Sequence, residues 1–210
     1  GTSQFHPKIA ALLNIFDAHL DFHKTKDAYV AAKMKLFQNQ TAEDWAIFNG
    51  EQAIAHELAQ QVASQVAWFN TREAVEQGAY LQDGSVYFRY ANQAPIPVIK
   101  EEEILLRGMH NRANILAATC MALLAGAKVE GIRHVLRNFQ GVEHRLEYVR
   151  TLHDVRYYND SKATNVEAAI QALSAFDDPL IWIAGGLDRG HSFAALRPYL
   201  HHVRAMIVYG

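Results

Sequence analysis

Short apolar runs alternate along the first third of the chain with stretches in which apolar residues recur every three or four positions. Buried strands are predicted at 8–15, 45–49 and 66–69. Helices are predicted at 25–38 and 51–64. Strands and helices in this alternation are typical of a parallel sheet covered by helices, so we expect the chain to begin with an α/β fold.

The alternation breaks at 80–90, where Asp83-Gly84 separates two segments of alternating polarity. A type I′ turn needs positive φ at both central positions, and Asp-Gly meets that need, so a β-hairpin is predicted there. A second hairpin is predicted at 146–159, around His153-Asp154. The remaining predicted elements are helices at 111–124, 129–139, 166–176 and 193–200 and strands at 180–184 and 205–209.

The change of pattern near Gly141 is the expected domain boundary. Residues 1–141 are predicted to form one domain, whose mainly parallel sheet carries helices and a small hairpin region. Residues 142–210 are predicted to form part of a Rossmann-like domain. Two or three strands rarely complete such a sheet, so we expect the 210 residues to be a piece of a longer protein.

The composition argues against several classes of protein. Lysine and arginine number 20 against 22 acidic residues, a balance that gives no electrostatic basis for binding nucleic acid. The single Cys120 cannot form an internal disulfide, which fits a reducing compartment. No apolar run approaches the roughly 18 residues of a membrane span, and the first residues do not resemble a signal peptide. We expect a cytoplasmic globular protein that binds neither membrane nor nucleic acid.

Polar residues follow the first predicted strand at the edge where open α/β sheets bind ligands. Asp17, His19 and Asp21 are spaced as metal or phosphate chemistry requires, although an ordinary polar loop is the commoner explanation of such spacing. Lys33 lies in the apolar stripe of the helix at 25–38. Such a lysine often extends to water. Alternatively, it is a desolvated amine, and a neutral amine can take up carbon dioxide and present carbamate oxygens to a hard cation.

Further polar residues lie at helix starts and strand ends. Asn111 and Asn114 lie at the start of a predicted helix. Asn111 is most simply explained as its N-cap. Asn114, one turn further on, could instead hydrogen-bond to the edge of an adenine. Lys162 and Thr164 follow a predicted strand and suit an anionic ligand, whereas a capped turn would leave them without a role. Arg189 lies in a glycine-rich turn and can pair with a carboxylate or phosphate. Together these clusters favour a ligand site.

These segments, in this order, resemble the Mur ligase family from residue 5 to residue 210. The motifs of its central domain are Asn-x-x-x-x-His-x-Asp at 14–21, Tyr-x-Ala-Ala-Lys at 29–33 and Gly-x-His-Asn-x-x-Asn at 108–114. The words Asn-Asp-Ser-Lys-Ala-Thr-Asn at 159–165 and Gly-Gly-Leu-Asp-Arg-Gly at 185–190 resemble the D-glutamate-adding branch in particular.

The resemblance implies that His19, Lys33, Arg145 and Lys162 carry the chemistry. His19 would bind a magnesium ion together with Lys33 as its carbamate. Arg145 would meet a phosphate of ATP, and Lys162 would lie near the site of attack. Ala18 stands where many members have an acidic residue, so the resemblance leaves the complete metal shell open.

The same resemblance implies the binding sites. Asn111 and Asn114 would face the adenine of ATP, and Asp160 would bind its ribose. Thr164 and Arg189 would lie around the incoming D-glutamate, together with the lysine near the site of attack.

The implied reaction ligates D-glutamate to UDP-N-acetylmuramoyl-L-alanine through an acyl phosphate, in peptidoglycan precursor synthesis, and a monomer is expected. The phosphate loop G-x-x-x-x-G-K-[ST] does not occur in the 210 residues, so the chain alone is expected to be inactive. Two alternatives stay open. One is another Mur or folylpolyglutamate-type ligase that differs in its amino acid, and the other is a non-catalytic nucleotide-binding module.

Overall fold

The structure is a computed structural model, and it describes residues 3–15, 25–186 and 192–209. The chain packs into two compact units, one formed by Gly1–Leu105 with Arg112–Asn138 and the other by Leu106–Asn111 with Phe139–Gly210. The domain boundary expected near Gly141 stays a prediction. The second packing unit begins close to it, at Phe139, and also includes the earlier segment Leu106–Asn111. Among the described residues, no helix is both long and apolar enough to cross a lipid bilayer.

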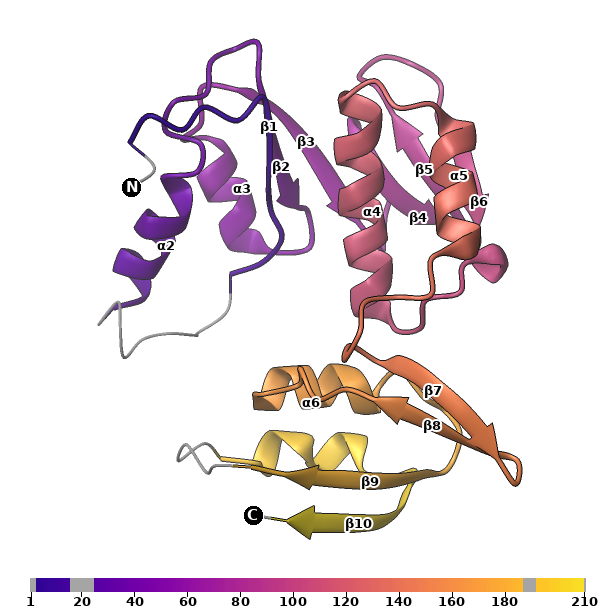
Figure 1. Ribbon diagram of the computed structural model, residues 1–210. Coiled ribbons are helices and arrows are strands. Elements are labelled where there is room, and N and C mark those ends of the chain that lie inside the picture. Colours follow the sequence, from indigo (N-terminus) through magenta and orange to yellow (C-terminus); the bar gives the residue numbers. More distant parts are fainter. Residues whose placement is uncertain (1–2, 16–24, 187–191, 210) are drawn as a thin grey trace. The chain divides into compact units, whose positions relative to one another are not determined.

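The described part of the first unit contains a six-stranded sheet in the order β1-β2-β3-β4-β5-β6 (Figure 1). Its first four strands are parallel to one another, and β5 and β6 continue the sheet in antiparallel fashion. The predicted α/β fold with a mostly parallel sheet is therefore confirmed. The strands are β1 (Ile9–Leu12), β2 (Trp45–Asn49), β3 (Gln65–Asn70), β4 (Gly78–Gln82), β5 (Ser85–Arg89) and β6 (Ile96–Lys100).

Helices cover this sheet. They are α2 (Lys26–Met34), α3 (Ala53–Ala59), α4 (Met109–Leu124) and α5 (Val129–Asn138), with a 3-10 turn at Glu101–Glu103. Tyr29 of α2 and Leu58 of α3 belong to one buried cluster with β1 and β2, in which Phe48 is completely buried. Arg133 of α5 donates from Nε to the carbonyl of Val98 in β6 at 2.8 Å.

The predicted hairpin at Asp83-Gly84 is confirmed, and both residues have positive φ, 47° and 68°. The helix predicted at 25–38 is shorter than expected and ends at Met34. The chain turns after that point, and Phe37 is buried against Phe48 with ring centroids 5.1 Å apart. The prediction for 51–64 was likewise too long, since only Ala53–Ala59 is helical.

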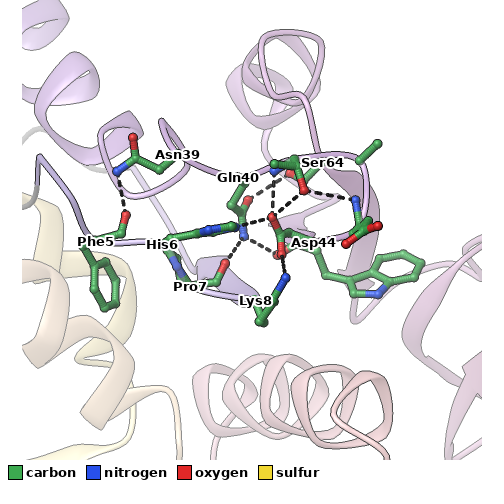
Figure 2. Close-up of polar contacts among 12 residues, drawn as sticks. Phe5, His6, Pro7, Lys8, Asn39, Gln40, Asp44 and Ser64 are labelled. Carbon is green, nitrogen blue, oxygen red and sulfur yellow. Dashed lines mark hydrogen bonds and ion pairs between the residues drawn. The ribbon is translucent and has the colours of Figure 1, made fainter.

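The start of β2 is fastened to the segment that precedes β1 (Figure 2). The fully buried carboxylate of Asp44 accepts hydrogen bonds from the amide of Thr41 at 2.7 Å and lies 2.6 Å from Nε2 of His6. The ammonium of Lys8 lies 3.2 Å from its other oxygen. Beside it, Gln40 donates from Nε2 to the carbonyls of Pro7 and Trp45 at 3.0 and 2.9 Å. These bonds hold the beginnings of the two strands in register.

The second unit contains two two-stranded sheets among its described residues. The hairpin predicted around His153-Asp154 is confirmed, with positive φ at both residues. The segment predicted as a helix at 193–200 is instead a 3-10 helix, since Pro198 lacks the amide that a continuing α-helix requires. The elements are β7 (Glu147–Leu152), β8 (Val155–Asn159), α6 (Val166–Leu173), β9 (Leu180–Gly185), the 3-10 helix Ala194–Tyr199 and β10 (Val203–Tyr209).

Candidate functional site

Lys33, on α2, is the described member of the first group of predicted site residues, and its side chain lies beside the carboxyl end of β1. The ammonium of Lys33 donates to the carbonyl of Asn14 at 3.2 Å and lies 5.0 Å from the ring centroid of Tyr29. Thr25 caps the helix that presents this lysine, because its hydroxyl accepts from the amide of Ala28 at 3.2 Å. Lys33 is half-buried, whereas Lys35 is exposed. The helix therefore directs one lysine at the strand end and the other at solvent.

Asp17, His19 and Asp21 lie outside the described residues, as does Ala18. Within the described ranges, no group of three or more histidine, cysteine or acidic side chains gathers in a way that could hold a metal ion. The donor chemistry at the strand end nevertheless suits magnesium if Lys33 carries a carbamate, since hard cations prefer oxygen ligands. The metal ligands remain predictions.

Two side chains that the sequence analysis did not single out also bind this strand end. Gln52 accepts from the amide of Ile15 through Oε1 at 2.9 Å and donates from Nε2 to the carbonyl of Ile15 at 3.3 Å. Asn49 donates from Nδ2 to the carbonyl of Leu13 at 3.4 Å. Both residues come after or at the end of β2, where parallel strands place their neighbours' carboxyl ends.

The second group lies in the other unit, around Asp160. Its Oδ1 accepts from the amide of Leu146 at 3.1 Å, and burial raises the pKa of its carboxyl despite this bond and the nearby positive charge of Arg145. Burial lowers the pKa of the neighbouring His110, whose Nδ1 is buried without a hydrogen-bond partner among the described residues. Perturbed titratable groups of this kind are more frequent at functional sites than elsewhere.

Gly108 makes room for the imidazole. It has a φ of +88°, and a Cβ on it would lie 2.8 Å from Cε1 of His110. Asn111 is not the N-cap of α4, an explanation that the sequence left open, because the helix already begins at Met109. Its side chain donates back to the carbonyl of Arg107 at 2.6 Å. Asn114 follows one turn later on the same helix and is exposed.

Hydrogen bonds join the residues around Arg145 to the residues around Lys162. The amide of Lys162 donates to the carbonyl of His144 at 3.1 Å, and Asn159 donates from Nδ2 to Glu147 at 3.2 Å. Arg145 is exposed, and its two chain neighbours, His144 and Leu146, both have positive φ, 67° and 44°. Such backbone strain is uncommon in residues with side chains and concentrates at functional sites.

Of the two remaining predicted site residues, the structure describes Thr164 but not Arg189. Thr164 is exposed and directly precedes Asn165, which caps α6 by accepting from the amide of Ala168 at 2.8 Å. Arg189 lies outside the described residues. The structure thus brings Arg145, Asp160 and Lys162 into one region of the second unit, and it places Lys33 in the first unit.

The family model and the curated relatives that match this chain all belong to the Mur ligases. A family model described as Mur ligase middle domain matches residues 1–122. The UDP-N-acetylmuramoylalanine–D-glutamate ligase of Geobacillus kaustophilus is 50% identical over 211 residues, which covers 100% of this chain and 46% of that protein. The enzyme of the same name from Bacillus subtilis is 46% identical over 210 residues, again 46% of its length. The chain spans about half the length of the curated relatives it matches.

Solved structures agree on the fold. MurF ligase from Thermotoga maritima in complex with ADP superposes with a TM-score of 0.70 at 18% identity, covering 98% of this chain and 49% of that chain. UDP-N-acetylmuramate–alanine ligase MurC from Thermotoga maritima gives a TM-score of 0.69 at 18% identity, covering 98% and 46%. At such low identity these structures support the architecture and not the choice of substrate.

Proposed function

The chain belongs to the Mur ligase family, and we propose that the full-length protein joins D-glutamate to UDP-N-acetylmuramoyl-L-alanine while ATP is converted to ADP and phosphate. The observation that carries this proposal is the 50% identity to a D-glutamate ligase along the entire chain, through both packing units. The motif at 159–165, which resembled the D-glutamate-adding branch, lies within that match.

The proposed reaction has two steps. The alanyl carboxylate attacks the γ-phosphorus of ATP, which forms an acyl phosphate and releases ADP. The amine of D-glutamate then attacks the acyl carbon, phosphate departs with the bonding electrons, and the nitrogen loses a proton as the peptide bond forms. Holding amine and acyl phosphate together makes the second step effectively unimolecular.

Residues of the second unit, together with Asn114 of the first, would bind the nucleotide and the amino acid. Asp160 would accept from the ribose hydroxyls, and Arg145 would stabilise charge that develops on the transferred phosphoryl group. Asn111 would contact the adenine, together with Asn114 on the next turn of α4. Lys162 would lie near the attacking amine. The backbone bond from Lys162 to His144 supports this part of the proposal, because it holds the lysine and Arg145 on adjoining segments.

Lys162 would share the binding of D-glutamate with Thr164 and Arg189. A guanidinium at position 189 would suit the side-chain carboxylate of D-glutamate, since its planar donors match two carboxylate oxygens. The hydroxyl of Thr164 supplies a further donor next to the start of α6.

Lys33 would be present as a carbamate and would hold a magnesium ion together with His19. When bound, magnesium would neutralise charge on the phosphates of ATP. The half-burial of Lys33 and the hydrogen bond from its Nζ to the carbonyl of Asn14 support this role, because they place the nitrogen beside the end of β1. We further propose a cytoplasmic location and a monomer.

The proposal is tested by measuring ADP release from the full-length protein with ATP, magnesium and UDP-N-acetylmuramoyl-L-alanine. D-glutamate is compared with L-glutamate, L-alanine and L-lysine. Turnover with D-glutamate alone is expected. Turnover with another amino acid would assign the protein to a sister ligase, and no turnover with any of them would favour a nucleotide-binding module.

A further inference from the structure

The carboxyl end of β1 is held by side chains that come from outside its own strand. Gln52 forms two hydrogen bonds to the backbone of Ile15, and Asn49 forms one to Leu13. Between these residues, the carbonyl of Asn14 accepts from Lys33 at 3.2 Å. The strand end is therefore the common partner of Gln52, Asn49 and the proposed reactive lysine.

Gln52 makes these bonds instead of a helix-capping hydrogen bond to the first turn of α3. It is the N-cap residue of α3, with extended backbone angles of −99° and 116°, and its side chain makes no capping bond. Ser, Thr, Asp or Asn at this position would stabilise the helix by accepting a hydrogen bond from an amide of its first turn. The side chain of Gln52 instead satisfies the amide and the carbonyl of Ile15, three residues beyond the end of β1.

The two hydrogen bonds fix the peptide units on both sides of Ile15. One of the bonded groups, the amide of Ile15, belongs to the same peptide unit as the carbonyl of Asn14. Because a peptide unit is planar, fixing the amide also fixes the direction of that carbonyl. The side chain of Ile15 is buried, so the unit is held from its other side as well. The orientation of the acceptor for Lys33 therefore depends directly on Gln52.

We propose that Gln52 is a positioning residue for Lys33. It sets the direction of the Asn14 carbonyl, and this carbonyl holds the lysine nitrogen in one place above the strand end. The significance for catalysis rests on the proposed function, in which the lysine nitrogen carries a carbamate. Outer hydrogen bonds of this kind commonly decide how precisely a reactive group is placed.

The test is competitive labelling of amines with acetic anhydride in the full-length protein, followed by mass spectrometry of the peptides. In Gln52→Ala the acetylation of Lys33 relative to Lys35 is expected to rise at least about threefold, because the nitrogen is no longer held or carbamylated to the same extent. Gln60→Ala is the matched control, since Gln60 is exposed at the other end of α3. Its labelling ratio is expected to equal that of the wild type.

A second variant separates this effect from a general loss of structure. Gln52→Glu retains the oxygen that accepts from Ile15 but cannot donate to its carbonyl, so an intermediate labelling ratio is expected. An unchanged ratio in both variants would overturn the proposal. Because labelling requires no catalysis, a shifted ratio in a protein without ligase activity would refute the proposed function and leave the positioning role standing.

The same variants give a catalytic readout. ADP release by Gln52→Ala is expected to fall at least about tenfold in air and to recover in part when bicarbonate is added, because carbamate formation is then driven by mass action. Gln60→Ala is expected to show neither the loss nor the recovery. A loss in Gln52→Ala that bicarbonate does not reverse, with unchanged labelling, would assign Gln52 a purely structural role.

Discussion

At the scale of single residues, Asp160 combines an unfavourable charge with a proposed contact to substrate. Burial raises the pKa of its carboxyl, so the folded protein holds the proton more tightly than the unfolded chain does. Stability is therefore lost as the pH rises from the unfolded pKa through the folded pKa, and at neutral pH the ionised carboxylate destabilises the fold. A group that is retained at such a cost is commonly explained by function.

Asp160→Asn is expected to leave the melting temperature of the full-length protein unchanged or higher at pH 7, while the KM for ATP rises at least about tenfold. The asparagine oxygen can still accept from the amide of Leu146, so the fold keeps this bond. Calorimetry and steady-state kinetics measure the two effects. Asp177→Asn, at an exposed position, should change neither. A clear fall in melting temperature at an unchanged KM would show that Asp160 is structural.

Lys33→Arg is expected to reduce kcat for ADP release by at least about 100-fold. Arginine retains the positive charge but is not deprotonated in proteins, so it cannot form a carbamate. Lys35→Arg is the control, because Lys35 lies two residues away on an exposed face and should retain full activity. Equal activities of the two variants would contradict the carbamate proposal and leave Lys33 as an ordinary amphipathic side chain.

Sequence reasoning identified Lys33 but not Gln52, and the reason is physical. A lysine within an apolar helical stripe conflicts with its local pattern, and such a conflict can be recognised in a single chain. Gln52 conflicts with nothing nearby. Its partner is the backbone of Ile15, 37 residues away, and any residue could supply that backbone. Only the parallel pairing of β1 and β2 brings the two together.

At the scale of elements, the junction of β3 and β4 depends on Gly78. This residue has a φ of +128°, and a Cβ on it would lie 1.8 Å from the carbonyl oxygen of Trp68. Because the obstacle is backbone, it cannot move without disturbing the pairing of the strands. Gly78→Ala is expected to destabilise the chain by about 3 kcal/mol or more, since strain and overpacking add.

Urea unfolding followed by circular dichroism measures this effect. Gly131→Ala provides the control, because Gly131 lies within α5 and a Cβ there would meet no atom within 4 Å. It should stabilise the helix by roughly 0.5–1 kcal/mol, as alanine does in place of glycine in helix interiors. A Gly78→Ala variant as stable as the wild type would show that the junction can rearrange.

The elements that the sequence predicted well are those with local signals. Both hairpins have two turn residues with positive φ, and a short sequence word was enough to place them. No strand was predicted at 96–100, where the structure has β6, and Pro97 is a residue that local rules disfavour in strands. The structure accommodates Pro97 by placing β6 at the edge of the sheet, where a missing amide costs little. An edge position is a property of the assembled sheet and has no local signature.

At the scale of the whole molecule, the buried Asp44 makes the first unit sensitive to acid. The hydrogen bond from His6, followed by that from the amide of Thr41, holds the pKa of this carboxyl below its usual range. A carboxyl with a lowered folded pKa stabilises the fold above its unfolded pKa of about 3.9, and this contribution is lost as the pH falls below it. The first unit should therefore weaken in acid.

Asp44→Asn tests this dependence. The variant is expected to be much less stable than the wild type at pH 7. The difference should shrink as the pH falls from about 3.9 toward 3, because the unfolded wild-type chain then takes up a proton that the folded carboxylate of Asp44 does not. Urea unfolding across this pH range measures both proteins. Glu43→Gln, which changes an exposed neighbour, should follow the wild type throughout. A difference that stays constant with pH would mean that the charge of Asp44 is not what stabilises the fold.

The two units of the chain should also differ in how readily their strands open. In the first, Ala46, Ile47 and Phe48 of β2 are completely buried between neighbouring strands and helices. In the second, Ile181 of β9 and Val208 of β10 are 64% and 68% exposed. A two-stranded sheet with so little burial is marginal, whereas a central strand opens only when its whole sheet unfolds.

Amide hydrogen exchange of the 210-residue chain should therefore be at least about 100-fold slower in β2 than in β10. The comparison is limited to amides that donate to a neighbouring strand, for which hydrogen bonding alone predicts equal protection. This limit is needed because β2 pairs with both β1 and β3, whereas β10 pairs with β9 and has a register shift between Val203 and Ala205. The expected difference comes from the free energy of opening, which burial of apolar surface dominates. Exchange measured by NMR or mass spectrometry separates the two explanations. Equal protection would show that the second unit is stabilised by more than its buried side chains indicate.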